Sequence, residues 1–326
     1  MKPGILMARA VFPDIVDFLG QHFDVQANQQ DQIFSEDELI ARLQGKQALF
    51  ATTSQAVTAR VLAACPELKI IANMAVGYNN VDLAAATAAG IMVTNTPDVL
   101  NETTADFAWA LLMAAARRVT ESEHWLRAGK WDKWTYDGFL GADVHGATLG
   151  ILGMGRIGQA IARRSSGFNM RVIYHNRSRL APQQEAAANH ATLVSKEDLL
   201  RQADHLVLVL PYSAATHHAI GATELALMKP GAVLVNIARG GIVDDLALIA
   251  ALRENRIAAA GLDVFENEPA LQPDFLRLTN VVLTPHIGSA SAPTRRAMAR
   301  CAANNLIAAF SGALPPNLVN QVSTLK

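Results

Sequence analysis

The chain has 326 residues, of which 51% are hydrophobic, and its 28 Lys and Arg nearly balance 29 Asp and Glu. That length and apolar content predict two domains, while the balanced charge gives no reason to expect nucleic acid or a membrane surface as a partner. Cys65 and Cys301 stand far apart in alanine-rich patterns, which predicts free core thiols in a reducing, cytoplasmic compartment. The apolar run 107–116 is too short for a membrane span, and no signal peptide is predicted.

The first hundred residues alternate strand-type apolar runs with helical patterns. The helical pattern at 35–44 opens with a capping box from Ser35 to Glu38, and the alternation predicts an α/β unit. Residues 101–129 follow and predict one long helix with a buried apolar stripe, which bridges this unit to the next. The strand-type runs of the first unit are 4–9, 48–53, 68–74 and 91–95.

The rest of the chain contains a second series of strand candidates separated by helical segments. Right-handed crossovers between parallel strands would join them into a second sheet. The predicted fold class is therefore α/β, with two doubly wound parallel-sheet domains. The six strand candidates are 147–153, 170–175, 205–211, 232–238, 259–265 and 281–285.

A glycine-rich motif, G-x-G-x-x-G, lies between the first of these strands and a helical segment. Gly153 permits a tight turn, Gly155 lets the backbone approach a pyrophosphate, and Gly158 allows the helix to pack closely on the strand. The helix begins at Arg156 and Ile157, whose amides would face the phosphates at the positive end of the helix dipole. The strand before the motif and the helix after it predict a dinucleotide-binding loop.

The next strand ends in VIYHNRSR, without the acidic residue that commonly holds the adenosine ribose of NAD. Asn176 stands at the strand tip and cannot repel a 2′-phosphate, while Arg177 offers a planar fork to that phosphate and Ser178 a hydroxyl. NADPH is therefore the preferred cofactor in this interpretation, with NADH possible. The alternative is that Arg177 is a solvated loop residue and the protein is indifferent to the phosphate.

Three further motifs, NIARGGIVDD, GLDVFENEP and TPHIGSASAPTR, follow the glycine loop. Together with that loop they resemble the D-isomer-specific 2-hydroxyacid dehydrogenase family over nearly the whole chain, and within it the glyoxylate/hydroxypyruvate reductases, including those that also reduce 2-ketogluconate. The resemblance implies a Rossmann NAD(P)-binding domain, residues 101–287, inserted into a flavodoxin-like substrate-binding domain made of residues 1–100 and 288–326. It also implies an active site in the cleft between the two domains.

The reduction of a small 2-keto acid requires a cation for the carboxylate, a proton donor for the carbonyl oxygen and a hydride donor on the opposite side. By the resemblance, Arg239 binds the carboxylate and polarises the carbonyl, His286 is the acid/base, and Glu268 is the partner of His286. A carboxylate beside an imidazole stabilises the imidazolium and keeps it a competent acid. Each residue alone could be an ordinary surface or loop residue, but their order in three motifs favours catalysis.

The resemblance assigns further positions to binding. Val76 and Gly77 would present backbone amides to the substrate carboxylate, and Ser289 would lie near the substrate. Thr104 would lie near the cofactor, and Asp263 would hold the nicotinamide carboxamide. Asp263 could instead cap a turn, and Ser289 a helix. No metal site is predicted.

The aromatic segment 130–141 contains Trp131, Trp134, Tyr136 and Phe139. It lies where reductases of this type exchange an arm between the subunits of a dimer, and in them a tryptophan near the end of the arm touches substrate in the neighbouring pocket. Here Phe139 is the best match to that position. A homodimer is therefore predicted, and the alternative for the aromatic cluster is a plain interface core without contact to the pocket.

Two other functions are open to a chain with these motifs. Transcriptional corepressors that resemble the family use the same fold as a nucleotide-sensing dimeric binding module, and they can retain the catalytic residues. A dehydrogenase for another D-2-hydroxy acid is the other alternative. The absence of long basic or low-complexity segments argues against the corepressor alternative.

Overall fold

The computed structural model describes residues 2–322, which fall into two compact units. Unit 1 contains the chain up to Leu100 and from Ser291 onward, and unit 2 is Asn101–Ala290. The second boundary lies slightly beyond the predicted residue 287. The reason is local: the amides of Ile287 and Gly288 donate to a carboxylate within unit 2, so the chain leaves that unit only after them.

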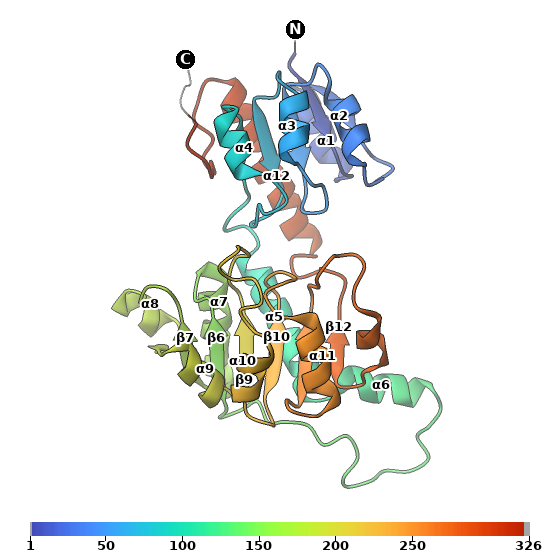
Figure 1. Cartoon of the computed structure of the whole chain (residues 1–326), viewed down its shortest axis with the longest axis vertical. Coiled ribbons are helices and arrows are strands. Elements are labelled where there is room, and N and C mark those ends of the chain that lie inside the picture. Colours follow the sequence, from blue (N-terminus) through green and yellow to red (C-terminus); the bar gives the residue numbers. More distant parts are fainter. Residues whose placement is uncertain (1, 323–326) are drawn as a thin grey trace. The chain divides into compact units, whose positions relative to one another are not determined.

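Unit 1 is a five-stranded parallel sheet in the flavodoxin-like order β2-β1-β3-β4-β5. Helices α2, α3 and α4 cover one face, while α12 packs on the other face beside α1 (Figure 1). The predicted capping box is confirmed, because the side chains of Ser35 and Glu38 each accept a backbone amide of the other. The strands are β1 (Gly4–Met7), β2 (Asp24–Ala27), β3 (Ala48–Ala51), β4 (Ile70–Asn73) and β5 (Met92–Thr94). The helices are α1 (Pro13–Gly20), α2 (Glu36–Leu43), α3 (Ala59–Ala64), α4 (Leu83–Ala88) and α12 (Ala292–Phe310).

Unit 2 is a seven-stranded parallel sheet in the order β12-β11-β10-β9-β6-β7-β8. The order runs in opposite directions from β6, which is the doubly wound Rossmann arrangement, and ligands bind at the carboxyl ends of such strands near the reversal. The strands are β6 (Thr148–Leu152), β7 (Arg171–His175), β8 (Thr192–Leu193), β9 (His205–Leu208), β10 (Val233–Asn236), β11 (Ala259–Leu262) and β12 (Val281–Leu283). The helices are α5 (Asn101–Ala116), α6 (Val119–Arg127), α7 (Arg156–Arg164), α8 (Pro182–Ala187), α9 (Lys196–Gln202), α10 (Ala222–Leu227) and α11 (Asp245–Arg253), with 3-10 turns at Ser165–Phe168 and Pro273–Arg277.

Two apolar cores sandwich the sheet of unit 2, one on each face. Because successive side chains of a strand point to opposite faces, Ile151 packs with α5 and α7 whereas Leu152 packs with α9, α10 and α11. The same helices are visible around the strands in Figure 1. Both faces are buried, which explains why the strands read as continuous apolar runs rather than alternating ones.

The prediction of one long helix over 101–129 is wrong, because the structure has two helices there, α5 and α6. Arg118 between them has a left-handed backbone, with φ of +53°. The chain that returns from the aromatic segment caps the C-terminal end of α5. The Ala142 amide donates to the Ala116 carbonyl oxygen at 2.8 Å. A side chain at Gly141 would collide with the same carbonyl, so the return needs a glycine. This contact joins segments far apart in sequence and leaves no periodic signal.

Two edge strands, β2 and β8, were not predicted as strands. Their side chains are only partly buried, so they lack the apolar runs that identify the inner strands. The apolar run 107–116 lies inside α5, and none of the helices in residues 2–322 is both long and apolar enough to cross a membrane.

Candidate active site

The glycine-rich loop joins β6 to α7, and two of its glycines are required by close contacts. Gly153 has φ of +101°, and a Cβ there would lie 2.8 Å from the Leu210 amide nitrogen. A Cβ at Gly158 would lie 2.5 Å from the Gly153 carbonyl oxygen. The space beside Gly155 is open, with no atom within 4 Å of a Cβ placed there. The loop therefore packs tightly on the sheet side and leaves its middle accessible to a ligand.

Arg156 and Ile157 form the first turn of α7. The amide groups of this turn lie at the positive end of the helix dipole, where phosphate groups bind. The structure thus places both predicted residues at the loop, next to Gly155.

Asn176 follows β7 and holds the glycine loop in place. Its side-chain oxygen accepts the Met154 amide at 2.7 Å, and its side-chain nitrogen donates to the Met154 carbonyl oxygen at 3.4 Å. The prediction placed Asn176 at the ribose. The structure adds a different task, because both ends of the amide already bind the loop that would receive the pyrophosphate.

Arg177 and Ser178 follow Asn176 and are exposed. Among the described residues Arg177 forms no ion pair or hydrogen bond. Arg179 differs, because its guanidinium makes two 2.9 Å hydrogen bonds to Glu185, which also accepts the Tyr174 hydroxyl at 2.7 Å. The Arg179 guanidinium and the Tyr174 hydroxyl hold the pKa of the Glu185 carboxyl below its usual range. Arg177 is therefore the arginine of this loop that is available to a ligand.

The three predicted catalytic residues follow neighbouring strands of unit 2. Arg239 comes after β10, Glu268 after β11 and His286 after β12. Nδ1 of His286 lies 2.7 Å from Oε2 of Glu268, and Arg239 is near enough to Glu268 for their charges to interact. With Nδ1 donating to the carboxylate, Nε2 is the nitrogen left for a ligand. The structure therefore brings the three side chains together at the carboxyl edge of the sheet.

Opposing effects set the charge of this group. Burial alone would raise the pKa of Glu268, but the hydrogen bond and charge of His286, the Phe265 amide 2.9 Å from Oε1, and Arg239 together bring that pKa below its usual value. Burial lowers the pKa of Arg239, and the Glu268 carboxylate acts in the opposite direction. Glu268 is therefore a carboxylate at neutral pH, and arginine keeps its charge in proteins.

Asp263 holds the loop that carries His286. Its Oδ1 accepts the Ile287 amide and the Thr284 hydroxyl, and its Oδ2 accepts the Gly288 amide, each at 2.8 Å. The side chain is buried, and this burial raises the pKa of Asp263 although the three donors oppose the shift. Contact with a nicotinamide carboxamide stays a prediction. The role that the structure adds is to fix the backbone on both sides of His286.

Two residues that the sequence interpretation missed position Arg239. A Cβ at Gly240 would lie 1.7 Å from the Phe265 carbonyl oxygen, so only glycine lets the Arg239 loop rest against the segment that leads to Glu268. The buried Asn236 side chain accepts the Ala238 amide at 3.0 Å and donates to the Arg239 carbonyl oxygen at 3.3 Å. The Gly-Gly pair after Arg239 was the available sequence signal for this close approach.

Thr104 and Ser289 also lie in unit 2. The Thr104 hydroxyl is buried, and no described residue hydrogen-bonds to it. A buried hydroxyl normally has a partner, so this one is open to a ligand atom. Ser289 stands in the turn that follows His286, close to the Gly288 amide that Asp263 holds.

In unit 1, Val76 and Gly77 follow β4. Their carbonyl oxygens are held by asparagines, with Asn95 donating to Val76 and Asn73 donating to Gly77, both at 2.9 Å. Within residues 2–322 no group accepts a hydrogen bond from either amide nitrogen. These two amides are therefore available to an anion such as a carboxylate. The asparagines were not identified from the sequence, because nothing in the sequence shows which loop they face.

The aromatic segment is largely exposed. Side chains at Trp131, Trp134 and Tyr136 are 61%, 77% and 82% exposed. Phe139 instead packs on its own chain, edge to face with Trp125 at 5.3 Å between ring centroids and under the Arg118 guanidinium. In this structure Phe139 therefore anchors the base of the segment, and contact between Phe139 and a partner's pocket stays a prediction.

These features fit a dinucleotide. The open glycine loop, the buried Thr104 hydroxyl without a partner among described residues, and the available Arg177 are the groups that phosphates and a nicotinamide nucleotide would require. The Rossmann sheet and this loop define a dinucleotide-binding protein with a histidine–carboxylate pair at the same edge.

Comparisons with known proteins identify the family. Residues 109–288 match the model described as D-isomer specific 2-hydroxyacid dehydrogenase, NAD binding domain. Glyoxylate reductase of Thermococcus onnurineus is 47% identical over 325 residues, which cover 98% of this chain and 97% of that protein. Glyoxylate reductase of Pyrococcus furiosus is 45% identical over 326 residues, covering 98% and 96%. The chain belongs to the D-isomer-specific 2-hydroxyacid dehydrogenase family, as its motifs predicted.

Solved structures agree over the whole fold. A glyoxylate reductase from Paecilomyes thermophila superposes with a TM-score of 0.88 at 34% identity, covering 98% of each chain. An NADPH-dependent glyoxylate/hydroxypyruvate reductase from Sinorhizobium meliloti, in complex with NADP and malonate, gives a TM-score of 0.88 at 35% identity and covers 98% of this chain and 97% of that one. The predicted combination of a Rossmann and a flavodoxin-like domain is confirmed.

Proposed function

We propose that this protein is an NADPH-preferring reductase that converts small 2-keto acids such as glyoxylate and hydroxypyruvate to 2-hydroxy acids. Where the product is chiral, it is the D isomer. The observation that carries the proposal is the hydrogen bond between His286 and Glu268 beside Arg239, at the carboxyl edge of a Rossmann sheet. The relatives named glyoxylate reductase support the substrate class. 2-Ketogluconate is a further candidate substrate.

Each side chain has a distinct task in this proposal. Arg239 binds the substrate carboxylate and polarises the keto oxygen, and in unit 1 the available amides of Val76 and Gly77 donate to the carboxylate. His286, held by Glu268, donates its Nε2 proton to the oxygen as negative charge develops there. The bound nicotinamide nucleotide supplies the hydride. Ser289 lies near the substrate, whereas Thr104, Asp263 and the glycine loop bind the nucleotide.

Cofactor preference in this proposal rests on the loop after β7. Arg177 has no described partner and Ser178 is exposed, so both can contact a 2′-phosphate, while no carboxylate stands at the strand tip to repel it. The solved Sinorhizobium meliloti reductase is named NADPH-dependent. In this proposal unit 2 is the nucleotide domain and unit 1 the substrate domain.

The decisive experiment is steady-state turnover of a panel of 2-keto acids with each cofactor. Glyoxylate, hydroxypyruvate, pyruvate and 2-ketogluconate should be compared by kcat/KM with NADPH and with NADH. Turnover of glyoxylate or hydroxypyruvate supports the proposal. Tight nucleotide binding without turnover of any acid would favour the nucleotide-sensing binding module instead.

Replacing Glu268 by Gln should change the pH dependence of reduction. Glutamine still accepts the hydrogen bond from Nδ1 of His286 but removes the negative charge that favours the imidazolium. Only imidazolium can donate the proton, so activity falls as pH rises through its deprotonation. The alkaline limb of kcat/KM for glyoxylate should therefore move to lower pH in Glu268→Gln. The surface variant Glu254→Gln is the control, and identical limbs in all three proteins would mean that the proton comes from another group.

We expect the protein to form a homodimer whose interface includes the aromatic segment 130–141. Exposed Trp131, Trp134 and Tyr136 together offer more apolar surface than isolated exposed residues do, which marks an interaction site. Sedimentation at micromolar concentration should give twice the 34.9 kDa mass of one chain, and the double variant Trp134→Ser/Tyr136→Ser should shift the equilibrium towards monomer. A stable wild-type monomer with full activity would contradict this expectation.

A further inference from the structure

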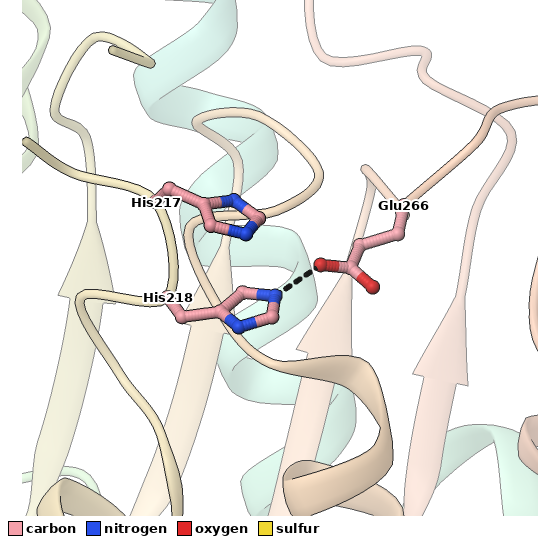
Figure 2. Close-up of side chains that lie close together, drawn as sticks. All are labelled: His217, His218 and Glu266. Carbon is pink, nitrogen blue, oxygen red and sulfur yellow. Dashed lines mark hydrogen bonds and ion pairs between the residues drawn. The ribbon is translucent and has the colours of Figure 1, made fainter. Parts of the chain in front are cut away.

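We propose that His217, His218 and Glu266 bind one divalent transition-metal ion, at a site separate from Arg239, Glu268 and His286. Each of the three offers one ligand atom, and these atoms all lie within 4.8 Å of one another. Figure 2 shows the two imidazole rings one above the other, with the Glu266 carboxylate reaching the edge of the lower ring, that of His218.

The fold brings these residues together from two loops at the same edge of the sheet. The histidines precede α10 on the loop after β9, and Glu266 lies on the segment after β11. Gly241 lies on the loop of the intervening strand, between His217 and Glu266, and its backbone is left-handed with φ of +76°. A Cβ there would lie 3.0 Å from Cε2 of Tyr212, the residue whose hydroxyl contacts His217. The His218 amide donates to the Gly241 carbonyl oxygen at 2.7 Å, which fixes the histidine pair beside that loop.

The donor set selects a class of ion. Two imidazole nitrogens and one carboxylate oxygen suit Zn²⁺, Co²⁺, Ni²⁺ or Cu²⁺, whereas Mg²⁺ and Ca²⁺ prefer oxygen ligands alone. Three protein ligands also leave a coordination position for water. The side chains of His218 and Glu266 are 37% and 21% exposed, so an ion and its water can reach them.

A hydrogen-bond partner orients the ring of His217, and a carboxylate lies near the ring of His218. The Tyr212 hydroxyl lies 3.2 Å from Nδ1 of His217, and Oδ2 of Asp244 lies 3.8 Å from Nδ1 of His218. Ligand histidines commonly have such a partner on the ring nitrogen that does not bind the metal. In both residues the pattern leaves Nε2 as the ligand atom, and Nε2 of His218 is the atom that now contacts Glu266.

The local charge favours a cation. Within the described part of the chain, neither Glu266 nor Asp244 forms an ion pair with a lysine or arginine; their ion-pair partner is His218. A divalent ion bound to Nε2 of His218 would take the place of the hydrogen bond that this atom now makes with Oε1 of Glu266. The rings now stack with centroids 3.8 Å apart and planes 23° from parallel, so the exposed His217 ring must rotate for its Nε2 to reach the same ion.

The test is a Co²⁺ titration of the full-length protein after treatment with a chelator. We expect saturation at one ion per chain, visible absorption bands of low-symmetry Co²⁺, and displacement of Co²⁺ by Zn²⁺. His217→Ala and Glu266→Gln should each weaken binding by at least the ten- to hundredfold that loss of an outer partner costs. His124→Ala removes a histidine whose side chain is 81% exposed on α6 and should leave the affinity unchanged.

Loss of metal binding in these variants can be distinguished from misfolding, and the binding measurement does not depend on reductase activity. His217→Ala removes an exposed ring and Glu266→Gln retains a hydrogen-bonding group, so both variants should keep the wild-type thermal unfolding midpoint in the presence of chelator. Zn²⁺ should raise that midpoint in wild type and in His124→Ala only, because ligand binding to the folded state stabilises it. Absence of saturable binding in wild type, or equal binding in His217→Ala, overturns the proposal.

Discussion

His286→Gln is expected to lower kcat for 2-keto acid reduction by roughly 10² to 10⁴, which is the range that general acid catalysis contributes. Glutamine has similar reach and can hydrogen-bond to Glu268 and to the substrate, but it cannot donate a proton to the forming alkoxide. The nucleotide loop follows other strands of the sheet, β6 and β7, so the dissociation constant for NADPH should change little. A fall in kcat without a change in cofactor affinity is the signature of a group needed only in the transition state.

The structure makes this substitution interpretable because the backbone around His286 is held by other groups. Asp263 accepts the amides of Ile287 and Gly288, and the Thr284 hydroxyl bonds to the same carboxylate. His286 itself has a left-handed backbone with φ of +55°, a conformation that asparagine tolerates well. His286→Asn is therefore the second variant, since it suits the backbone and also lacks the proton.

The role of His286 is tested by measuring pre-steady-state and steady-state turnover of glyoxylate in both variants. Thermal unfolding checks that each variant is folded. Both variants should remain folded and inactive to a similar degree. Near-normal turnover in either one would show that His286 is not the proton donor, and the roles taken from the family would then not hold for this chain.

Much of the candidate site was predictable because parallel sheets collect functional residues at one edge. Arg239, Glu268 and His286 each follow an apolar run, so strand prediction alone placed them at the carboxyl ends of three strands. Right-handed crossovers between them predicted a second parallel sheet, whereas the order of its strands was established by the structure. The glycine loop was the clearest case, because its strand, turn and helix are contiguous in sequence.

What the sequence did not reveal depends on contacts between distant segments. The hydrogen bond between Asn176 and Met154 was not predicted, because only the pairing of β6 with β7 brings these residues together. The break between α5 and α6 has the same origin, since the Ala116 carbonyl oxygen is taken by Ala142 from beyond the aromatic segment. Helical periodicity continues through Arg118, so a local pattern could not identify it.

The histidine pair is another feature that could not be interpreted from the sequence alone. His217 and His218 are adjacent in sequence, yet neither has a metal-ligand spacing with another histidine or cysteine. Glu266 reaches them only because β9, β10 and β11 are neighbours in the sheet. Ligand sets built across strands in this way are detectable in a structure before they are detectable in a sequence.

Arg177→Asp should reverse the cofactor preference. The substitution removes a charge-assisted contact to the 2′-phosphate and adds repulsion, which together should weaken NADPH binding by on the order of 2 to 4 kcal/mol, or about 30- to 1000-fold. NADH has no 2′-phosphate, so its affinity should be unchanged or improved, because a carboxylate at this strand tip can accept the ribose hydroxyls.

Arg177 is the appropriate target because it forms no ion pair within residues 2–322, whereas Arg179 is engaged by Glu185 and its loss would disturb the loop itself. Arg171→Asp is the matched control: it makes the same charge change at the opposite end of β7, where Arg171 donates to Gln202. Dissociation constants for both reduced cofactors should be measured by fluorescence titration in the three proteins. If the ratio of NADPH to NADH affinity moves only in Arg177→Asp, the 2′-phosphate is read by this arginine. An equal use of both cofactors by wild type, or an unchanged ratio in Arg177→Asp, would mean that Arg177 is a solvated loop residue and that the missing acid at the strand tip has another cause.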